Sequence, residues 1–574
     1  MLPVSVHSIL ENCLMRNNFA VKNRLVLIFL FIFTLGLFAS GSNEKPAPAP
    51  QEVFEKVIYT DADRKRMEIK NIEKLSEEKT PLALWRSYLM LRSLPDDKEA
   101  LDLYGRMVKK MESVFTTAVE KEDWTTALSC FNSVHALDPS VKTFCGWDED
   151  SLKSSSRLFT EYVSIKPSRE KVKVSRLING TVTVLVDLGL KVQSGVGYPN
   201  KVLGSGFFID KRGYLITNHH VIENMVDPTY EGYSRLYITL PDNPDDRIPA
   251  KVISWDSSLD LALLKVEITP PYVFSLGSSE NLDVGDRIYA IGSPVGLERT
   301  LTSGIVSAVD RPLLATGRVM QIDAAINSGN SGGPLIDEYG NVQGIVFAGI
   351  TGYEGLNFAI PVEYLKMNLE RMYKGDQIDH VWTGSFGMTK RTESLRPDGL
   401  EVLYTMPGSS AYVSELKKGD VITAIDGKTI KTLEEFQDVL LSKPLNTIAR
   451  ISCRTQDNET KDFPVYLAQR PENPGYEVYQ HDSLANAFLP LFGMEVSAGT
   501  STGKAKKFFV KTVYTGSPGE DSGFAPNDSI EVTKSKFSDD KSFIMTEVYA
   551  KKRRNGFMGM WVSLSNALDT PNYF

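Results

Sequence analysis

Three short motifs, in a fixed order along a β-rich stretch, constrain the fold of this chain most strongly. They are Thr217-Asn218-His219-His220-Val221, then Asp260-Leu261-Ala262-Leu263-Leu264, then Gly329-Asn330-Ser331-Gly332-Gly333-Pro334. From about Val172 to Pro361 the sequence consists of short apolar, β-branched runs separated by glycine turns. Several strands at such spacing indicate a barrel or sandwich, and the length suits two barrels of about six strands each, with a cleft between them.

The three motifs supply a base, an acid and a nucleophile. A serine hydroxyl attacks a peptide carbonyl only when a neighbouring group takes its proton, and imidazole does so because its pKa lies near neutrality. A carboxylate behind the imidazole fixes the tautomer and stabilises the imidazolium. We therefore predict Ser331 as nucleophile, Asp260 as acid and either His219 or His220 as base. The main-chain amides of Gly329 and Ser331 are the predicted oxyanion hole.

The order histidine, aspartate, serine is that of chymotrypsin-like serine proteases. The segment from Gly204 to Pro361 resembles in particular the HtrA/Deg family of these proteases. The likeness is carried by five stretches: Gly204-Ser205-Gly206-Phe207-Phe208-Ile209-Asp210, Gly213-Tyr214-Leu215-Ile216-Thr217-Asn218-His219-His220-Val221, Asp260-Leu261-Ala262-Leu263-Leu264, Asp323-Ala324-Ala325-Ile326-Asn327-Ser328-Gly329-Asn330-Ser331-Gly332-Gly333-Pro334-Leu335 and Phe358-Ala359-Ile360-Pro361. In the family's motif the histidine directly before valine is the base, so the resemblance assigns this role to His220.

The resemblance implies an all-β, double-barrel, trypsin-like serine protease domain at residues 166–375. It also implies an ATP-independent endopeptidase that degrades misfolded envelope proteins through an acyl-enzyme, without a cofactor or metal. Family members are commonly trimers or larger assemblies, so a homo-oligomer is implied as well. The alternative is a chaperone or scaffold whose protease fold is silent, although intact His220, Asp260 and Ser331 argue against it.

Substrate selectivity is predicted from the residues around the nucleophile. Ala325 stands six positions before Ser331, where trypsin-like enzymes carry a charge-selecting aspartate. Ile326 and Phe347 supply apolar walls nearby. We expect Ala325, Ile326 and Phe347 to line an S1 pocket for small or medium aliphatic side chains rather than basic ones.

Residues 380–470 resemble a bacterial PDZ domain. The markers are Gly384-Ser385-Phe386-Gly387-Met388, Leu400-Glu401-Val402-Leu403, Pro407-Gly408-Ser409-Ser410-Ala411 and Lys418-Gly419-Asp420-Val421-Ile422. Such domains hold a C-terminal carboxylate on the amides of an aromatic-Gly-aliphatic loop, beside which the peptide adds as a strand. Phe386, Gly387 and Met388 are the predicted peptide-binding residues, with a helix near Leu433 to Leu440 as the far wall.

The last part of the chain contains an internal repeat. Phe386-Gly387-Met388 recurs as Phe492-Gly493-Met494, and Gly419-Asp420-Val421 as Asn527-Asp528-Ser529. Nearly constant offsets predict a second copy of the same α+β domain, which we place at residues 480–574. The copy is degenerate, because it lacks the Gly-Asp-hydrophobic turn. Peptide binding and a purely structural or oligomer-contacting role both remain open for it.

The region 57–165 has few glycines and apolar residues at three- and four-residue spacing, which predicts an all-α domain. Two stretches in it, from Leu82 to Pro95 and from Thr126 to Pro139, faintly resemble tetratricopeptide repeats. Their offset is longer than the usual period of about 34 residues. A helical bundle without repeat identity is an equal alternative.

The N-terminal segment predicts export. Lys22 and Arg24 precede an apolar run from Leu25 to Ala39, which small residues follow. This pattern is typical of a signal peptide, and the run is shorter than the roughly 20 residues of a membrane span. We expect residues 1–41 to be a signal peptide or an N-terminal anchor, which places the protein in the periplasm or cell envelope. An inner-membrane tether through residues 25–39 is the alternative to cleavage, and a Pro/Ala linker, 42–56, follows.

Composition adds bounds on domains and partners. At 574 residues the chain is too long for one core, so we expect a multidomain protein of about three to five domains. The net charge of −8 gives no reason to expect nucleic acid as a partner. Four widely spread cysteines show no metal-ligand spacing. The partners that the resemblance implies are unfolded or misfolded proteins and C-terminal peptides.

Overall fold

The computed structural model describes residues 52–57, 59–163, 167, 169–292, 300–327, 329–349, 356–499 and 506–574. The predicted export segment and most of the linker lie outside the described residues, as does Ser328 of the serine loop. The described chain forms two compact units, 49–471 with 570–574, and 472–569. No helix in the described part of the chain is long and apolar enough to cross a membrane.

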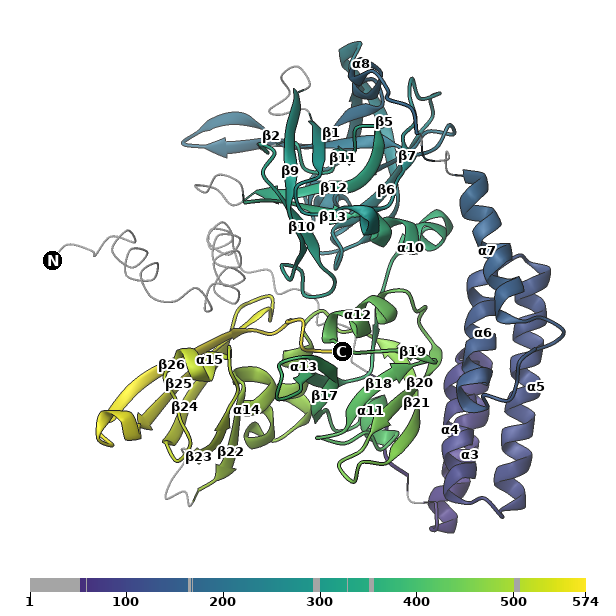
Figure 1. The fold of residues 1–574 in the computed structure, drawn as a ribbon, viewed down its shortest axis with the longest axis vertical. Coiled ribbons are helices and arrows are strands. Elements are labelled where there is room, and N and C mark those ends of the chain that lie inside the picture. Colours follow the sequence, from purple (N-terminus) through teal and green to yellow (C-terminus); the bar gives the residue numbers. More distant parts are fainter. Residues whose placement is uncertain are drawn as a thin grey trace. The chain divides into compact units, whose positions relative to one another are not determined.

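The N-terminal region is a bundle of helices, as predicted, and Figure 1 shows them lying side by side. Aspartates begin three of the helices, because the side chains of Asp61, Asp97 and Asp123 accept hydrogen bonds from first-turn amides. The predicted likeness to tetratricopeptide repeats is not confirmed. The helices are α3 (Ala62–Glu78), α4 (Thr80–Ser93), α5 (Lys98–Glu120), α6 (Trp124–Leu137) and α7 (Glu149–Val163).

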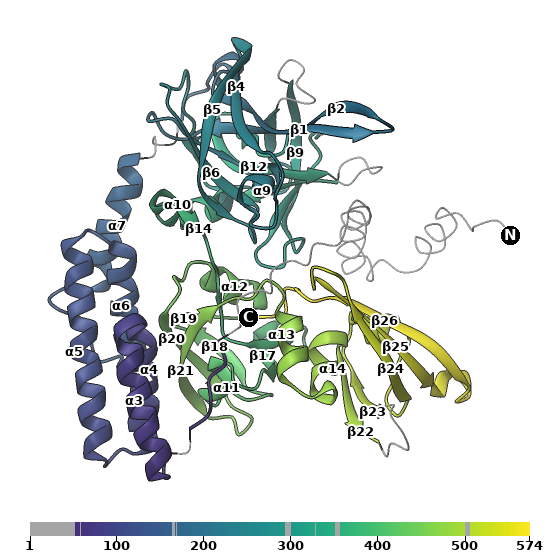
Figure 2. The same cartoon turned by 180° about the vertical axis from the view of Figure 1, so that it is seen from behind.

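Two closed β-barrels follow, which confirms the predicted double-barrel class. The first barrel closes through pairing of β5 with β6, and the second through pairing of β11 with β12. A long hairpin of β1 and β2 extends from the first barrel (Figure 2). The first barrel contains β1 (Thr181–Gln193), β2 (Val196–Phe208), β3 (Tyr214–Thr217), β4 (Arg235–Leu240), β5 (Asn243–Asp256), β6 (Leu261–Val266) and the later β14 (Asp376–Gln377). The second contains β7 (Ser275–Leu276), β8 (Arg287–Gly292), β9 (Thr300–Arg311), β10 (Val319–Ile322), β11 (Pro334–Ile336), β12 (Asn341–Gly349) and β13 (Asn357–Pro361).

Short helices complete this part of the chain. They are α8 (Val174–Ile178), α9 (His219–Val226), η1 (Ser279–Asn281) and α10 (Val362–Lys374). From α10 the chain passes through β14, which pairs with β5, into the first PDZ domain.

The first PDZ domain is a six-stranded sheet path, β15-β21-β20-β18-β17-β16, with β19 beside β18. Strand β16 lies at one end of this path. The predicted far-wall helix is present as α12. The elements are β15 (Val381–Trp382), β16 (Ser385–Arg391), β17 (Pro397–Thr405), α11 (Ser410–Val413), β18 (Val421–Ile425), β19 (Lys428–Thr429), α12 (Leu433–Leu441), β20 (Thr447–Arg454) and β21 (Thr460–Gln469).

The helical bundle and the first PDZ domain share one hydrophobic core, which the sequence did not suggest. Trp85 of α4 is fully buried against Tyr466 of β21, with ring centroids 5.9 Å apart, and its indole N–H donates to the carbonyl of Pro464 at 3.0 Å. Phe54 packs edge-on against both rings. Because one core spans both regions, we treat them as one folding unit.

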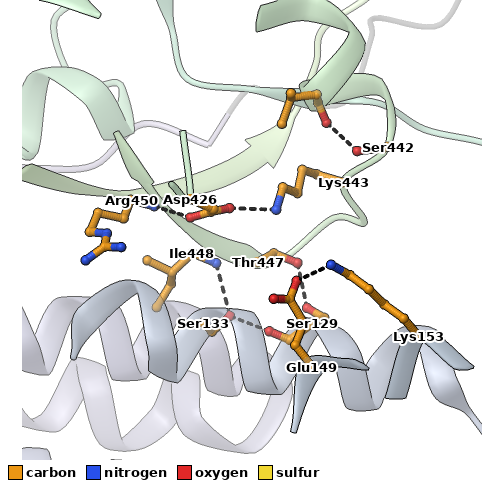
Figure 3. A network of polar contacts seen from close by, with 11 residues as sticks. Ser129, Ser133, Glu149, Lys153, Asp426, Ser442, Lys443, Thr447, Ile448 and Arg450 are labelled. Atoms are coloured by element: carbon orange, nitrogen blue, oxygen red, sulfur yellow. Dashed lines mark hydrogen bonds and ion pairs between the residues drawn. The ribbon is translucent and has the colours of Figure 1, made fainter. Parts of the chain in front are cut away.

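Polar contacts tie α6 to β20 inside this shared core (Figure 3). The Ser133 hydroxyl accepts a hydrogen bond from the amide of Ile448 at 3.0 Å. The hydroxyls of Ser129 and Thr447 are 2.6 Å apart. Ser129 and Ser133 thus each have a polar partner across the interface, so these contacts favour one register of the two surfaces.

The second PDZ domain is a five-stranded meander, β22-β23-β24-β25-β26, preceded by two helices. Its elements are α13 (Pro474–His481), α14 (Leu484–Phe492), β22 (Met494–Ala498), β23 (Lys506–Val513), α15 (Pro518–Asp521), β24 (Ser529–Phe537), β25 (Phe543–Lys551), η3 (Arg553–Asn555) and β26 (Gly559–Ala567). The predicted boundary at 574 differs from the structure, because residues 570–574 belong to the other compact unit.

The repeated Phe-Gly-Met triplets do not occupy equivalent positions in the two domains, contrary to the prediction from the internal repeat. Gly493 ends α14 with a φ of 65°, and a Cβ there would lie 2.1 Å from Ser517 Cβ. Gly384 has a φ of 82° and the same relation to Ser409, at 2.0 Å. Gly493 is therefore the counterpart of Gly384, not of Gly387.

Candidate active site

His220 and Asp260 are brought together by two neighbouring strands of the first barrel. Thr217, at the end of β3, pairs with Ala262 of β6, so the first turn of α9 lies beside the residue that precedes β6. Nδ1 of His220 lies 2.7 Å from one carboxylate oxygen of Asp260, and its amide donates to the other at 2.8 Å. Two bonds between the same residues fix the orientation of the imidazole ring.

The Asp260 main chain is itself held in place. Its φ of 53° lies in the left-handed region, which a residue other than glycine adopts only when its surroundings hold it there. The side-chain amide of Asn218 donates to the Asp260 carbonyl at 2.8 Å. Asn218 is fully buried between the two motifs, so it positions the aspartate from the histidine side.

The two adjacent histidines have opposite electrostatics. Burial alone lowers the pKa of His220, but the charge of Asp260 and the hydrogen bond to it outweigh burial, so the pKa is raised. Burial dominates at His219 and lowers its pKa, against the charges of Asp260 and Glu223, and no carboxylate in the described part of the chain hydrogen-bonds to that ring. Only His220 therefore has the partner that a general base needs to stabilise its protonated form.

Ser331 comes from the second barrel and is bound to the first through Ser205. The amide of Ser205, on β2, donates to the carbonyl of Ser331 at 2.7 Å, and its hydroxyl donates to the carbonyl of Gly329 at 2.6 Å. Thr217 Oγ1 in turn donates to the Ser205 carbonyl at 2.7 Å. Ser205 thus links the serine loop to the strand that carries the histidine motif.

The glycine after the nucleophile is required by space. Gly332 has a φ of 84°, and a Cβ there would lie 2.2 Å from the Ser205 carbonyl oxygen and 2.4 Å from Thr217 Oγ1. Its amide donates to the carbonyl of Val346 at 2.8 Å. The loop backbone is therefore packed directly against the first barrel, which brings Ser331 to the boundary between the barrels.

The Ser331 hydroxyl itself points elsewhere. It donates to the carbonyl of Phe347 at 3.3 Å, and no hydrogen bond joins Ser331 to His220 among the residues that the structure describes. Catalytic hydrogen bonds are often long or absent without substrate. Attack requires the hydroxyl to turn from Phe347 toward the imidazole.

The other predicted protease-site residues lie around this loop. Gly329 is buried, with a φ of 102°. Ala325 is exposed, while Ile326 is half-buried against the core of the second barrel and Phe347 is half-buried at the end of β12. None of these three side chains carries a charge, and the S1 pocket that they are expected to line stays a prediction.

The predicted peptide-binding residues Phe386, Gly387 and Met388 lie on β16 of the first PDZ domain. The amide of Gly387 donates to the carbonyl of Asn572 at 3.1 Å, and that of Ser385 to the carbonyl of Phe574 at 2.9 Å. The sequence interpretation missed Ser385, although it stands within the same glycine-flanked marker. It missed the roles of Ser205, Thr217 and Asn218 as well, since motif matching shows types of residue and not the hydrogen bonds that join them in the folded chain.

Family models match four parts of the chain. Residues 204–345 match the trypsin-like peptidase domain, and 401–453 match the PDZ domain. Residues 475–568 match the TP0546 family PDZ domain, and 63–155 match a domain of unknown function.

Curated relatives match about half of the chain. A probable periplasmic serine endoprotease DegP-like of Chlamydia pneumoniae is 31% identical over 343 residues, covering 57% of this chain and 67% of the relative. One of the same description from Halomonas elongata is 37% identical over 245 residues, covering 40% and 48%. A solved structure, the HtrA-type protease AlgW with decapeptide, matches 52% of this chain and 98% of its own at 24% identity, with a TM-score of 0.44. The chain spans about half to two thirds of the length of these curated relatives.

Proposed function

Because the chain belongs to the HtrA/Deg family of serine endopeptidases with PDZ domains, we propose that it cleaves unfolded or misfolded proteins through His220, Asp260 and Ser331. His220 takes the hydroxyl proton of Ser331 as the hydroxyl attacks the peptide carbonyl, and returns it to the leaving amine. Asp260 keeps the imidazole of His220 in the tautomer that can accept this proton. Water then hydrolyses the acyl-enzyme in the same way.

One observation carries this proposal. His220 and Asp260 are joined by two hydrogen bonds on the first barrel, and Ser205 of the same barrel is hydrogen-bonded to the loop that carries Ser331. A silent scaffold would not need a carboxylate that raises the histidine pKa against the effect of burial. The amides of Gly329 and Ser331 are the proposed oxyanion hole. Loss of one such donor typically costs about 10²–10³ in rate.

Specificity and location are further parts of the proposal. Ala325, Ile326 and Phe347 would form an S1 pocket for small or medium aliphatic side chains, and preferred cleavage after Lys or Arg in a peptide panel would contradict it. The relatives' names support a periplasmic location. A homo-oligomer and a tether through residues 25–39 are proposed from the family resemblance and the apolar run.

The test is casein degradation together with fluorophosphonate labelling. Ser331→Ala should abolish both, and His220→Gln should lower the labelling rate by about 10³-fold or more. His219→Gln is the matched control and should retain most of the rate. A Ser331→Ala protein that still degrades casein would refute the proposed nucleophile.

The pH dependence of labelling checks the base. Because the pKa of His220 is raised, its neutral, proton-accepting form is lost as the pH falls through a value above the ordinary histidine value of about 6.5. The labelling rate should fall on that acidic side and level off above it. An inflection below the ordinary value would point to His219, whose pKa is lowered.

A further inference from the structure

The last five residues, Thr570–Phe574, pack against β16 of the first PDZ domain: a turn from Thr570 to Tyr573 leads into Asn572–Phe574, which pair antiparallel with β16. The amide of Phe574 donates to the carbonyl of Ser385 at 2.9 Å, and the Ser385 amide donates back to the Phe574 carbonyl at 2.9 Å. Phe386 and Tyr573 form an antiparallel bridge. This is the geometry by which an extended peptide augments a sheet edge.

The side chains of this segment fill the place of a bound peptide. The Phe574 ring is fully buried in the core of the first PDZ domain, 5.2 Å edge-on from Phe436 of α12. A Cβ on Gly387 would lie 3.1 Å from this ring. Tyr573 is also fully buried, with its ring 5.1 Å from that of Phe386.

Polar groups hold the segment at both walls. Thr383 Oγ1 donates to the Phe574 carbonyl at 2.6 Å, which gives this oxygen two donors. The Asn572 side-chain amide donates to the Gly387 carbonyl at 2.8 Å, and the Gln437 amide on α12 donates to the carbonyl of Pro571. Donors from β16, its entry and α12 thus converge on one short segment, as in a ligand site rather than a surface contact.

We propose that residues 570–574 are an internal ligand of the first PDZ groove, which external peptides must displace. The inference rests on the proposed peptide-binding role of this groove and adds its resting occupant. It also defines the ligand class: an extended segment whose last side chain is aromatic or large and aliphatic, with a polar side chain two positions earlier that reaches the Gly387 carbonyl.

The test measures binding of a fluorescein-labelled peptide of residues 568–574, Leu-Asp-Thr-Pro-Asn-Tyr-Phe, to the full chain carrying Ser331→Ala to prevent cleavage. In this background Phe574→Ala should bind the peptide at least about tenfold more tightly, because an intramolecular competitor is weakened. Asn572→Ala removes one hydrogen bond of the tail but keeps the buried Phe574 ring, so the labelled peptide should bind about threefold more tightly. Phe557→Ala, an exposed aromatic in the second PDZ domain, is the matched control and should change nothing.

Equal affinity in all four proteins, or absence of binding to both tail variants, would overturn the inference. Hydrogen exchange at the Ser385 and Gly387 amides gives a second measurement in case Phe574→Ala misfolds. Both amides should be protected in the protein with the natural tail, and both should exchange faster in Asn572→Ala. Unchanged exchange would also count against the internal ligand.

A second peptide separates this inference from the proposed function. If the tail variants bind an unrelated heptapeptide ending in Val but not the tail peptide, the groove is a peptide site and the internal ligand is wrong. If they bind only the tail peptide, the internal ligand stands and external substrate capture fails. Casein degradation reports on the protease chemistry independently of both.

Discussion

The two PDZ domains share a glycine–serine contact before the first strand of the sheet, but they differ in the helix that would line a peptide groove. Gly384 and Gly493 both have positive φ and both pack against a serine, Ser409 and Ser517 respectively. In the first domain α12 stands opposite β16. In the second, residues 506–569 are fully described and no counterpart of α12 occurs there, since a turn at residues 538–542 alone joins β24 to β25. The repeat has thus preserved a sheet frame, while the helical wall opposite the first strand is present in the first copy alone among the described residues.

The surroundings of the two sheets differ as well. The first domain shares its core with the helical bundle and has its groove occupied by residues 570–574. The second forms a compact unit of its own over residues 472–569. Stability of the first domain should therefore depend on distant parts of the chain, and stability of the second should not.

The largest expected effect is that of Trp85→Ala. Emptying this fully buried site should cost about 3–5 kcal/mol, and should destabilise the helical bundle and the first PDZ domain together. Trp561→Ala, at an exposed position on β26, should change stability by about 0.5 kcal/mol or less. Urea denaturation with domain-resolved hydrogen exchange measures both. If Trp85→Ala unfolded the helical bundle but left the first PDZ domain folded, the inference that the two regions fold as one unit would be wrong.

Next in size are the paired substitutions Gly384→Ala and Gly493→Ala. Each places a methyl group within 2.1 Å of a serine Cβ at positive φ, so each should cost its own domain about 2–4 kcal/mol. Only Gly384→Ala should also weaken peptide binding. Thermal unfolding and peptide titration of the two variants check this, and a loss of peptide binding in Gly493→Ala would show that the second domain has a groove after all.

A smaller effect is expected at the polar contacts between α6 and β20. Ser133→Ala leaves the amide of Ile448 buried without its acceptor, which should cost about 1–3 kcal/mol. The Ser133 hydroxyl also donates to the Ser129 carbonyl at 2.8 Å. Ser155→Ala removes the same kind of bond, to the Ser151 carbonyl, at a half-exposed position of α7 and serves as control. Chemical denaturation compares the two, and equal changes would indicate that the interface bond contributes nothing.

The smallest effect concerns pH and the second domain. Burial raises the pKa of Glu477 on α13, against the opposing charge of His481. A raised folded-state pKa means that its stability contribution is present below the unfolded value of about 4.3 and is lost as the pH rises through the folded value. Glu477→Gln should therefore stabilise the second domain at pH 7, by less than Ser133→Ala destabilises its interface, and have no effect near pH 4. Differential scanning calorimetry at the two pH values tests this, and a stabilisation that persists at pH 4 would contradict it.

The sequence predicted those features that depend on residue type at a fixed spacing. Acyl-transfer chemistry needs a histidine, a carboxylate and a serine flanked by glycines, and Asp260, Ser331 and one of two adjacent histidines could be recognised on that basis. The family resemblance then selected His220. The β-rich runs indicated a barrel or a sandwich, because each strand must bury its apolar side, and the length and the family resemblance favoured two barrels. The rotation of the Ser331 hydroxyl toward Phe347 has no such signal, since packing of the whole loop determines it.

Contacts between distant segments were beyond sequence interpretation. The apolar composition of α4 around Trp85 indicates burial on more than one side, but not that Tyr466 covers it. Residues 570–574 have no periodicity at all, and their partner on β16 is set by a groove that exists only in the folded domain. The Phe-Gly-Met likeness was misleading for the same reason: Phe492 ends a helix, whereas Phe386 lies in a strand.

Residues 570–574 also set a threshold for the groove. A tethered segment reaches its site at an effective concentration that is typically millimolar for a short flexible connection, however dilute the protein is. A stray chain terminus of ordinary affinity would therefore seldom gain access, while a local excess of unfolded protein would displace the segment often. The occupied groove would respond to the density of damaged chains around the protease, and not to the presence of any single one.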